Sequence, residues 1–233
     1  MSGFRHELKY LISYREKDLI IQRLKDFAGL DTHAEGGQYM IRSLYFDDMH
    51  HSAYEEKLSG VVSRKKYRIR IYDLKDEYIR FECKIKRGSY IYKKSAPLSR
   101  EECDRIIGGD VSFLSGRQEE VLQEFYIKWM TEMLRPEVIV DYDRIPYTYD
   151  GGTVRITFDM HIRSAFEDYD IFNREIPVYE AMAGDSLIME VKYTEFMPDI
   201  FRSIIDSSEL ARTSASKFVI CDDIKRKLHG GMI

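Results

Sequence analysis

Apolar and polar residues alternate along the stretch KYRIRIYDLKDEYIRFECKIK, which covers residues 66–86. In its first half Tyr67, Ile69 and Ile71 fall on one parity, and basic residues fall on the other. The alternation resumes after a short polar break and continues to Lys86. Because successive side chains of a strand point to opposite faces of a sheet, this pattern predicts a hairpin with one apolar face and one basic face.

Similar alternation predicts further strands, and capping and turn signals separate them from helices. The expected strands outside the hairpin cover residues 4–12, 38–47, 137–149, 153–159, 186–193 and 216–223. The expected helices cover residues 14–28, 49–58, 117–134 and 195–206, and another begins at a capping box of Ser99 and Glu102. The sequence Asp-Gly-Gly at residues 150–152 predicts a hairpin turn. Because these strands are not continuous apolar runs, we expect about eight mostly antiparallel strands in an α+β fold.

The composition is that of a folded protein with a slightly acidic balance. The chain has 233 residues, 44% hydrophobic and 33% charged, which suits one domain over residues 1–233. Its formal net charge of -4 argues against a nucleic-acid partner, because domains that bind nucleic acid are usually basic as a whole. Three cysteines lack metal-type spacing, and no apolar run approaches the ~18–20 residues of a membrane span. We expect a soluble cytoplasmic protein, which leaves room for a membrane-protein partner.

In each predicted strand, every second position is polar, and we call this set of positions the polar parity. Its charged residues are mainly cations, although the whole chain holds 36 Lys and Arg residues against 40 Asp and Glu residues. The cations at these positions are Arg5, Lys9, Lys66, Arg68, Arg70, Arg80, Lys84, Lys86, Arg155, Lys192 and Lys217. The anions there are Glu7, Glu82, Asp159 and Glu190. A solvated sheet face explains one such strand, but solvated faces normally mix the two signs. The segregation favours a polyanion site, because crowded cations repel one another unless counter-ions are present.

Closing the sheet into a barrel with its basic face inward would gather these residues around one axis. The lumen would suit a linear polyphosphate, because Arg and Lys side chains on rigid strands bind phosphate oxygens well. A divalent ion is usually held by one or two carboxylates together with substrate phosphates, which makes Glu190 and Glu7 candidate ligands, followed by Glu82. The apolar faces would pack outward against the helices.

Seven short motifs occur in an order that resembles a known family. They are RHELKY at 5–10, SLYFD at 43–47, KYRIRIY at 66–72, FECKIK at 81–86, VRITFD at 154–159, EVKY at 190–193 and SKF at 216–218. Together they resemble the catalytic domain of the vacuolar transporter chaperone (VTC) polyphosphate polymerases. That family belongs to the triphosphate tunnel metalloenzymes, relatives of the CYTH phosphatases.

The resemblance implies an eight-stranded antiparallel β-barrel tunnel, flanked by helices, that binds nucleoside triphosphate or polyphosphate with a divalent cation. The residues with implied catalytic roles are Lys9, Arg68, Arg70 and Glu190, of which Glu190 would also hold the metal. The other residues that would contact phosphates or lie beside them are Lys84, Tyr142, Arg144, Arg155 and Lys217. The polar parity adds further phosphate-binding candidates, namely Arg5, Lys66, Lys86 and Lys192.

Two positions depart from the family pattern. Arg5 stands where the wider superfamily has the first of two alternating glutamates, which suits the polymerase branch better than the phosphatase branch. Ser214 stands where the polymerases have a lysine shortly before the one that matches Lys217, so one phosphate contact is expected to be weakened or lost.

Three functions remain open on these residues. The first is a polymerase that transfers the γ-phosphoryl group of ATP to a polyphosphate chain with Mn²⁺ or Mg²⁺, for which no covalent protein nucleophile is needed. The second is a tripolyphosphatase or nucleoside triphosphatase, in which Glu7 or Glu82 would orient water. The third is a module that binds polyphosphate without turnover, which the change at Ser214 leaves open. ATP and inorganic polyphosphate are the expected ligands, and the sequence does not predict an oligomeric state.

Overall fold

The computed structural model describes residues 5–88, 90–149, 153–182, 184–194, 196–206 and 210–230. Within these residues eleven strands form one sheet in the order β11-β1-β10-β8-β7-β3-β4-β5-β6, with β2 paired to β7 and β9 paired to β8. The strands are β1 (His6–Ser13), β2 (Gly29–Leu30), β3 (Tyr39–Asp47), β4 (Ser63–Tyr72), β5 (Lys75–Arg87), β6 (Tyr90–Leu98), β7 (Arg135–Tyr149), β8 (Val154–Ala165), β9 (Tyr179–Glu180), β10 (Ser186–Tyr193) and β11 (Ala211–Arg212). The helices are α1 (Tyr14–Leu24), α2 (Ser52–Leu58), α3 (Arg100–Ile107), α4 (Glu120–Thr131), α5 (Asp199–Asp206) and α6 (Lys217–Gly230), with short 3-10 helices at Glu35–Gly37 and Ser112–Gly116.

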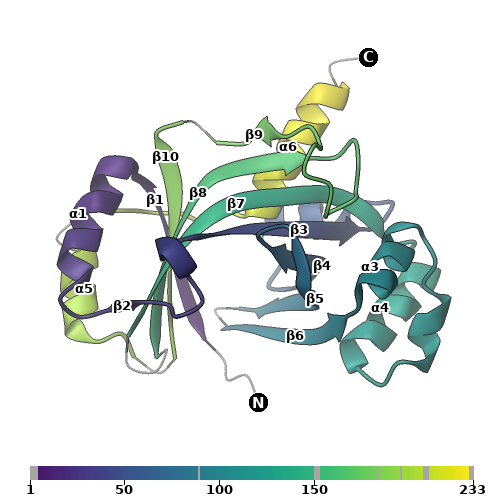
Figure 1. The fold of residues 1–233 in the computed structure, drawn as a ribbon, viewed down its shortest axis with the longest axis horizontal. Helices are drawn as coiled ribbons and strands as arrows, with labels where there is room; N and C mark the ends of the chain where they lie inside the picture. Colours follow the sequence, from purple (N-terminus) through teal and green to yellow (C-terminus); the bar gives the residue numbers. More distant parts are fainter. Residues whose placement is uncertain are drawn as a thin grey trace.

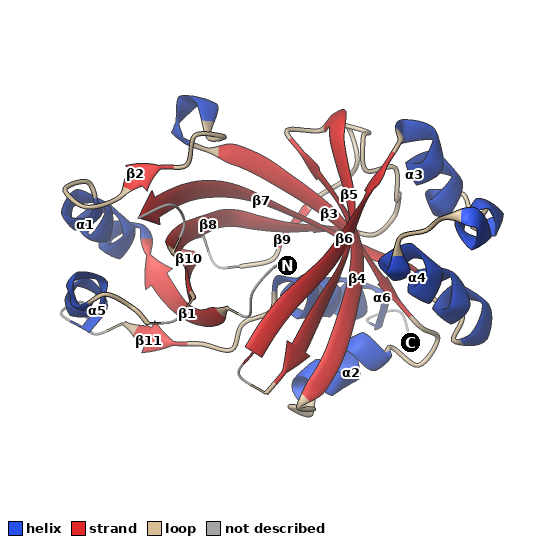
Figure 2. Ribbon diagram, turned by 90° about the horizontal axis from the view of Figure 1, so that it is seen from below, coloured by secondary structure: helices blue, strands red, loops and turns tan. Residues whose placement is uncertain are grey.

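All strand pairs are antiparallel, as predicted, and the sheet curls so that β1 and β6 approach each other (Figures 1 and 2). Arg5, just before β1, forms one isolated bridge with Ile91 on β6, in which the Arg5 amide donates to the Ile91 carbonyl oxygen at 3.4 Å. Beyond this bridge, the described residues form no ladder between the two strands. The expected closed barrel of eight strands is therefore wrong in two respects, because the sheet has eleven strands and hydrogen bonds do not close it.

Seven of the eight predicted strands and all five predicted helices are present with shifted ends. The capping box at Ser99 and Glu102 begins α3, as predicted. The strands that the pattern missed are β6 at the edge of the sheet and the two-residue strands β2, β9 and β11. The turn expected at residues 150–152 lies outside the described residues.

The predicted last strand, residues 216–223, is wrong, because this stretch begins the helix α6. The prediction rested on the alternation of Lys217, Phe218 and Ile220, which is too short to separate a strand from a helix. In the structure Phe218, Cys221 and Asp222 are buried, which is the spacing of one helix face. The amide of Ile220 donates to the carbonyl oxygen of Ser216 at 2.9 Å where the helix starts. Lys217 therefore stands in the first turn of a helix.

Two apolar clusters pack the outer face of the sheet against the helices, as the alternation predicts. One cluster joins β4 and β5 to α3 and α4, and a second joins β1, β8 and β10 to α1 and α5 (Figure 1). A third cluster lies on the inner face, where Phe218 of α6 packs near Tyr45 of β3 and Tyr142 of β7, which also line the cavity described below. Phe81 on β5 and Phe125 on α4 are fully buried, with ring centroids 4.6 Å apart, so replacing Phe125 by alanine should cost about 3–5 kcal/mol of stability. This packing leaves the polar parity facing inward.

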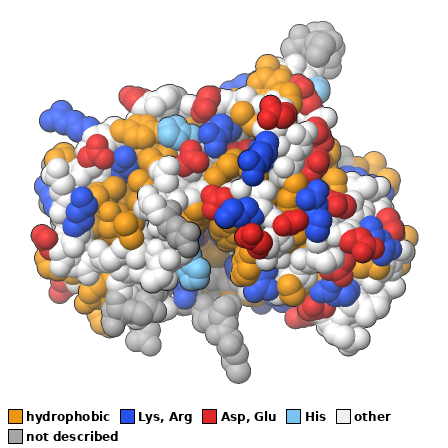
Figure 3. Space-filling model, in the orientation of Figure 1, with side chains coloured by type: hydrophobic (Ala, Val, Ile, Leu, Met, Phe, Trp, Pro, Cys, Tyr) orange, Lys and Arg blue, Asp and Glu red, His pale blue; other side chains and the backbone are white. Residues whose placement is uncertain are grey.

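The outer surface differs from the inner face in its charge pattern. Figure 3 shows acidic and basic side chains interspersed on one outer face of the molecule. In the part of the chain that the structure describes, no helix is both long enough and apolar enough to cross a membrane.

Candidate functional site

The inner face of the curled sheet encloses a cavity of about 320 Å³. Twelve cations line it, against two carboxylates. The cations are Lys9, Lys57, Arg64, Lys66, Arg68, Arg70, Lys84, Lys86, Arg144, Lys192, Arg212 and Lys217, and the carboxylates are Glu7 and Glu190. Tyr45, Tyr142 and the segment from Thr213 to Ser216 complete most of the wall. The structure thus brings together most residues of the polar parity from strands that are distant in sequence.

Strand register explains why the cations are so dense at one side of the cavity. On the β4–β5 hairpin, Lys66 lies directly opposite Lys84, and Arg68 lies directly opposite Glu82. Side chains two residues apart along a strand share a face, so these rows repeat along the inner wall. Like charges directly opposite one another destabilise a sheet, so the row of Lys66 and Lys84 costs stability unless anions lie nearby.

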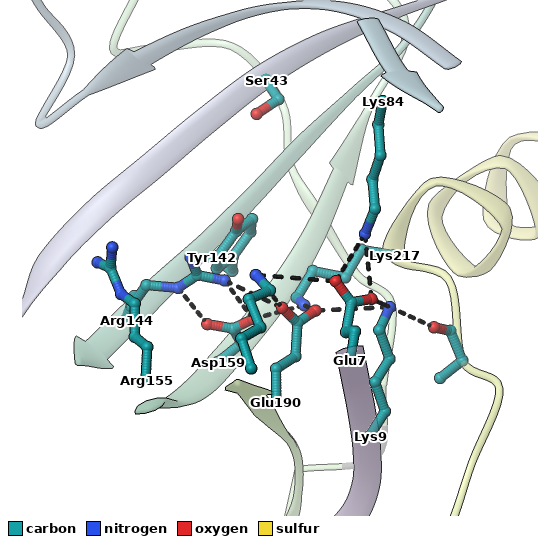
Figure 4. Close-up of polar contacts among 12 residues, drawn as sticks. Glu7, Lys9, Ser43, Lys84, Tyr142, Arg144, Arg155, Asp159, Glu190 and Lys217 are labelled. Atoms are coloured by element: carbon teal, nitrogen blue, oxygen red, sulfur yellow. Dashed lines mark hydrogen bonds and ion pairs between the residues drawn. The ribbon is translucent and has the colours of Figure 1, made fainter. Parts of the chain in front are cut away.

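Glu7 on β1 lies between cations from three strands (Figure 4). Its two carboxylate oxygens accept hydrogen bonds from Lys84 Nζ at 2.9 and 3.0 Å, and Lys9 Nζ lies 3.4 Å away. Lys192 Nζ is more distant, at 3.9 Å. Burial would raise the pKa of Glu7, but Lys84 and Lys9 outweigh it and hold that pKa far below its usual range. Glu7 is therefore ionised at neutral pH.

Glu190 on β10 lies beside Glu7 in the same network (Figure 4). Its Oε1 accepts a hydrogen bond from Lys217 Nζ at 3.0 Å, and Lys192 Nζ lies 3.0 Å from its Oε2. Lys9 Nζ is 3.5 Å from Glu190 Oε1, so one ammonium group contacts both carboxylates. Burial would raise the pKa of Glu190, but Lys192 and Lys217 hold it well below its usual range.

Asp159 on β8 positions two of the cavity's cations, Arg144 and Lys217. Its carboxylate accepts two hydrogen bonds from Arg144, from Nε at 2.6 Å and from Nη2 at 2.7 Å. The Lys217 ammonium lies 2.5 Å from the same carboxylate. Asp159 is fully buried, so this fork is pre-organised. Tyr142 supplies a ring next to both cations, with Lys217 Nζ 4.9 Å and Arg144 Cζ 5.2 Å from its centroid.

Glu82 on β5 positions Arg68 in a similar way. It accepts a hydrogen bond from Arg68 Nε at 2.8 Å, and Lys93 Nζ donates to it at 2.5 Å. Arg68 Nη1 also donates to the hydroxyl of Tyr45 at 2.8 Å. Burial would raise the pKa of Glu82, but Arg68 and Arg70 hold it far below its usual range. Glu82 is 1% exposed and does not line the cavity, so it anchors Arg68 and is poorly placed to hold a metal ion.

Two phosphate-binding candidates lie elsewhere. Arg5 is exposed and takes part in the bridge to Ile91. Arg155 Nη2 lies 2.9 Å from Asp31 and donates to the hydroxyl of Tyr39 at 3.0 Å, and its side chain stands apart from the carboxylates in Figure 4. Neither Arg5 nor Arg155 lines the cavity, so their proposed roles stay predictions.

The sequence pattern missed several residues of the wall. Lys57 comes from the short helix α2, where strand alternation carries no information, and its Nζ donates to Ser214 Oγ at 3.3 Å. An ammonium group therefore reaches the position where Ser214 replaces the family lysine. Arg64 lies two residues before Lys66 and shares its strand face. Starting the predicted strand two residues earlier would therefore have included Arg64 among the candidates. Tyr45 and Arg212 carried no signal before the fold was known.

The carboxylates of the cavity could supply part of the coordination of a divalent ion, with the phosphates of a substrate supplying the rest. No cluster of three or more His, Cys, Asp or Glu side chains suited to a metal ion exists among the described residues. Glu7 and Glu190, however, are ionised, adjacent and exposed to the cavity, and they offer the hard oxygen ligands that Mg²⁺ and Mn²⁺ take. Phosphate oxygens would have to complete the coordination.

Solved structures of other proteins share this fold. A candidate adenylate cyclase from Bacillus halodurans aligns with a TM-score of 0.58 at 15% identity, covering 92% of this chain and 94% of that one. A candidate adenylyl cyclase from Hippeastrum, described as having a dominant triphosphatase activity, aligns with a TM-score of 0.53 at 14% identity, covering 94% and 95%. A candidate adenylate cyclase from Vibrio parahaemolyticus aligns with a TM-score of 0.51 at 10% identity, covering 94% and 98%.

Sequence comparison supplies the family. A search among curated proteins gave no match. The family model of the VTC domain matches residues 4–223, which is nearly the whole chain and includes every residue of the cavity wall. This protein therefore belongs to the VTC domain family.

Proposed function

We propose that this protein binds nucleoside triphosphate and polyphosphate in the cavity and transfers the γ-phosphoryl group of ATP to a polyphosphate chain. The observation that carries the proposal is the cavity lining, in which twelve cations surround two carboxylates. A linear polyanion would contact cations on several strands at once, whereas a single small anion would reach only a few of them. Membership of the VTC domain family supports the same ligand class.

The chemistry needs positioned charges and no protein nucleophile. Lys9, Arg68 and Arg70 would bind and neutralise phosphate oxygens, while the terminal phosphate of the acceptor already carries the attacking oxygen as an anion. Because Glu82 fixes Arg68 and Asp159 fixes Arg144, these guanidinium groups lose little freedom when a ligand binds. Glu7 and Glu190 would hold a divalent ion, which when bound neutralises charge on the transferring phosphoryl group.

Hydrolysis of a triphosphate is the second candidate function. It is favoured by the position of Glu7, an ionised carboxylate inside the cavity that could orient a water molecule. The triphosphatase activity described for the Hippeastrum protein of similar fold fits this alternative.

Incubation of the purified protein with ATP and Mn²⁺ separates these functions. The transferase proposal expects long polyphosphate on a gel, formed only when metal is present. Release of orthophosphate without polymer would instead identify a hydrolase, and absence of both products would leave a binding module. A parallel reaction with the Glu190→Gln variant shows whether the activity belongs to this cavity and not to a contaminant.

A further inference from the structure

The helix α2 is too short to hold its position by itself, yet it carries a residue of the cavity wall. It spans seven residues, Ser52–Leu58, and helices of that length are marginal in water without tertiary contacts. Lys57 in its last turn lines the cavity, and Lys57 Nζ donates to Ser214 Oγ at 3.3 Å. The place of this ammonium group therefore depends on the contacts that fix α2 to the rest of the molecule.

Asp47, at the end of β3, anchors the first turn of α2. Its carboxylate accepts hydrogen bonds from the backbone amides of Ala53 at 2.9 Å and Tyr54 at 3.1 Å. Amides of the first helical turn have no partner within the helix, so this side chain acts as a cap. The start of α2 is thus fixed to the sheet, whereas Lys57 lies near the other end of the helix.

A contact between Tyr54 on α2 and Asp223 on α6 fixes the middle of the short helix. The hydroxyl of Tyr54 donates to Asp223 Oδ1 at 2.6 Å, and Arg226 Cζ lies 3.9 Å from the centroid of the Tyr54 ring. Tyr54 is 9% exposed. The hydrogen bond to Asp223 raises the pKa of Tyr54 to about 12, so the hydroxyl remains a donor at neutral pH.

The helix α6 is itself tied to two strands of the sheet. Lys225 Nζ donates to the side chain of Glu137 on β7 at 2.7 Å and to the backbone carbonyl oxygen of Glu137 at 3.0 Å. Ser164 Oγ on β8 donates to the carbonyl oxygen of Cys221 at 2.8 Å. Because these bonds hold α6 on the sheet, Asp223 gives α2 a fixed point of attachment.

We propose that Tyr54 and Asp223 are positioning residues, which hold Lys57 in the cavity wall where it contacts a bound polyanion. Tyr54 and Lys57 lie three residues apart, so they are neighbours on one face of α2. Lys57 belongs to the electrostatic surroundings of the cavity, because burial, Arg64 and Lys9 all lower its pKa. Without the Tyr54–Asp223 contact, the last turn of α2 would have to be ordered at the moment of binding. The inference rests on the proposed function in taking the ligand of the cavity to be a polyanion.

Tripolyphosphate affinity, measured by calorimetry in EDTA, tests the inference through a double-mutant cycle. The variants are Tyr54→Phe, Lys57→Gln and the two combined. Removing the Tyr54 hydroxyl should weaken binding by roughly threefold or more, within the range of one hydrogen bond. In the Lys57→Gln background the same change should have no further effect, because the residue that Tyr54 positions is gone. The matched control is Tyr179→Phe, which removes a hydroxyl that donates to Glu167 at 2.6 Å outside the cavity lining.

Two variants of Asp223 separate position from charge. Asp223→Ala and Asp223→Asn remove the same charge, but asparagine keeps an oxygen that can accept a hydrogen bond from Tyr54. We expect the alanine variant to lose affinity as Tyr54→Phe does and the asparagine variant to keep most of it. Thermal unfolding of all variants shows how much stability each has lost, so that affinities are compared between Tyr54→Phe and Tyr179→Phe at known stability.

Four results would overturn the inference: unchanged affinity in Lys57→Gln, additive losses in the cycle, equal losses in the two Asp223 variants, or an equal loss in Tyr179→Phe. Any of them leaves the transferase proposal intact if the wild type still makes polymer. Coupled losses in a protein that makes no polymer would instead remove the transferase proposal and leave the positioning roles standing. A wild type that binds no tripolyphosphate would overturn both.

Discussion

Lys84 on β5 donates to Glu7 on β1 at 2.9 and 3.0 Å, although five strands lie between β5 and β1 in the sheet. The contact is possible only because the sheet curls until its inner face meets itself. It also pairs a cation predicted to bind phosphate with a carboxylate predicted to hold metal. In the ligand-free protein these groups neutralise each other, so a ligand must compete with an existing ion pair.

Arg68→Ala should weaken polyphosphate binding with or without metal. Arg68 is held by Glu82 and Tyr45 and lines the cavity. The loss should be about 1.5–3 kcal/mol of binding free energy, the value of a charge-assisted hydrogen bond. Calorimetry with tripolyphosphate measures it, beside the control Arg105→Ala on α3. If both variants lose the same affinity, only net charge matters and Arg68 makes no specific contact.

Glu190→Gln should separate metal-dependent chemistry from binding. Turnover should fall by ~10²-fold or more, as for the loss of one electrostatic stabiliser at an active site. Tripolyphosphate affinity in EDTA should stay equal or rise, because a repelling charge is gone. ATP consumption and calorimetry are measured for Glu190→Gln and for the control Glu132→Gln, whose carboxylate pairs with Lys128 on the outside of α4.

The same variant should be less stable without ligand. Lys9, Arg144, Lys192 and Lys217 share Glu190 as a counter-ion and would lose it together. Added tripolyphosphate should restore the midpoint of thermal unfolding. Full activity in Glu190→Gln, or metal-free binding as weak as that of Arg68→Ala, would make Glu190 a structural residue.

Lys66→Met should raise the stability of the ligand-free protein and weaken polyphosphate binding. Burial, together with Lys9 and Arg64, lowers the pKa of Lys66 well below 10.5. Between that lowered pKa and 10.5 the unfolded state binds more protons, so the free energy of unfolding should rise with pH in this window. Lys66→Met should reduce this slope, to which other lysines with lowered pKa values such as Lys84 also contribute, and add up to about 1 kcal/mol near neutral pH, the cost of like charges across a strand pair.

Urea unfolding at about pH 7 and about pH 10 measures the slope in the wild type and in the variant. The matched control is Lys65→Met, on the opposite face of β4, where Lys65 pairs with Glu124. A Lys66→Met protein that is less stable than wild type at neutral pH would mean that the packing of Lys66 against Phe218 outweighs the repulsion.

Tripolyphosphate should raise the thermal unfolding midpoint far more than monophosphate does at equal ionic strength. Ligands that bind only the native state stabilise it by mass action, by about 2.7 kcal/mol at a hundredfold excess over the dissociation constant. Because the contacts are ionic, the shift should shrink as sodium chloride is added. Thermal scans across a salt series provide the measurement. Equal shifts from chloride and tripolyphosphate at equal ionic strength would argue against a specific site.

Alternation predicted the hairpin and the faces of its residues because both properties are local. The strand β6 was missed because it lies at the edge of the sheet, where Pro97 can sit opposite Arg80 without breaking an inner ladder. Lys57 could not be found, since it reaches the cavity only after α2 packs against β4. The partners of Glu82 and Asp159 likewise depend on strand register and on the curl of the sheet, which no single strand encodes.

The pairing of Glu7, Glu190 and Asp159 with surrounding lysines and arginines makes the cavity resemble a small ion-exchange resin. Many of its cations are paired with tethered carboxylates that cannot diffuse away. A ligand that enters meets these ion pairs, so part of its electrostatic attraction is used to loosen them. Such a matrix retains multivalent anions and releases monovalent ones, because each additional charge on one molecule displaces the tethered groups at little further entropic cost. Selectivity for a polymer over its monomer would then follow from valence as well as from shape.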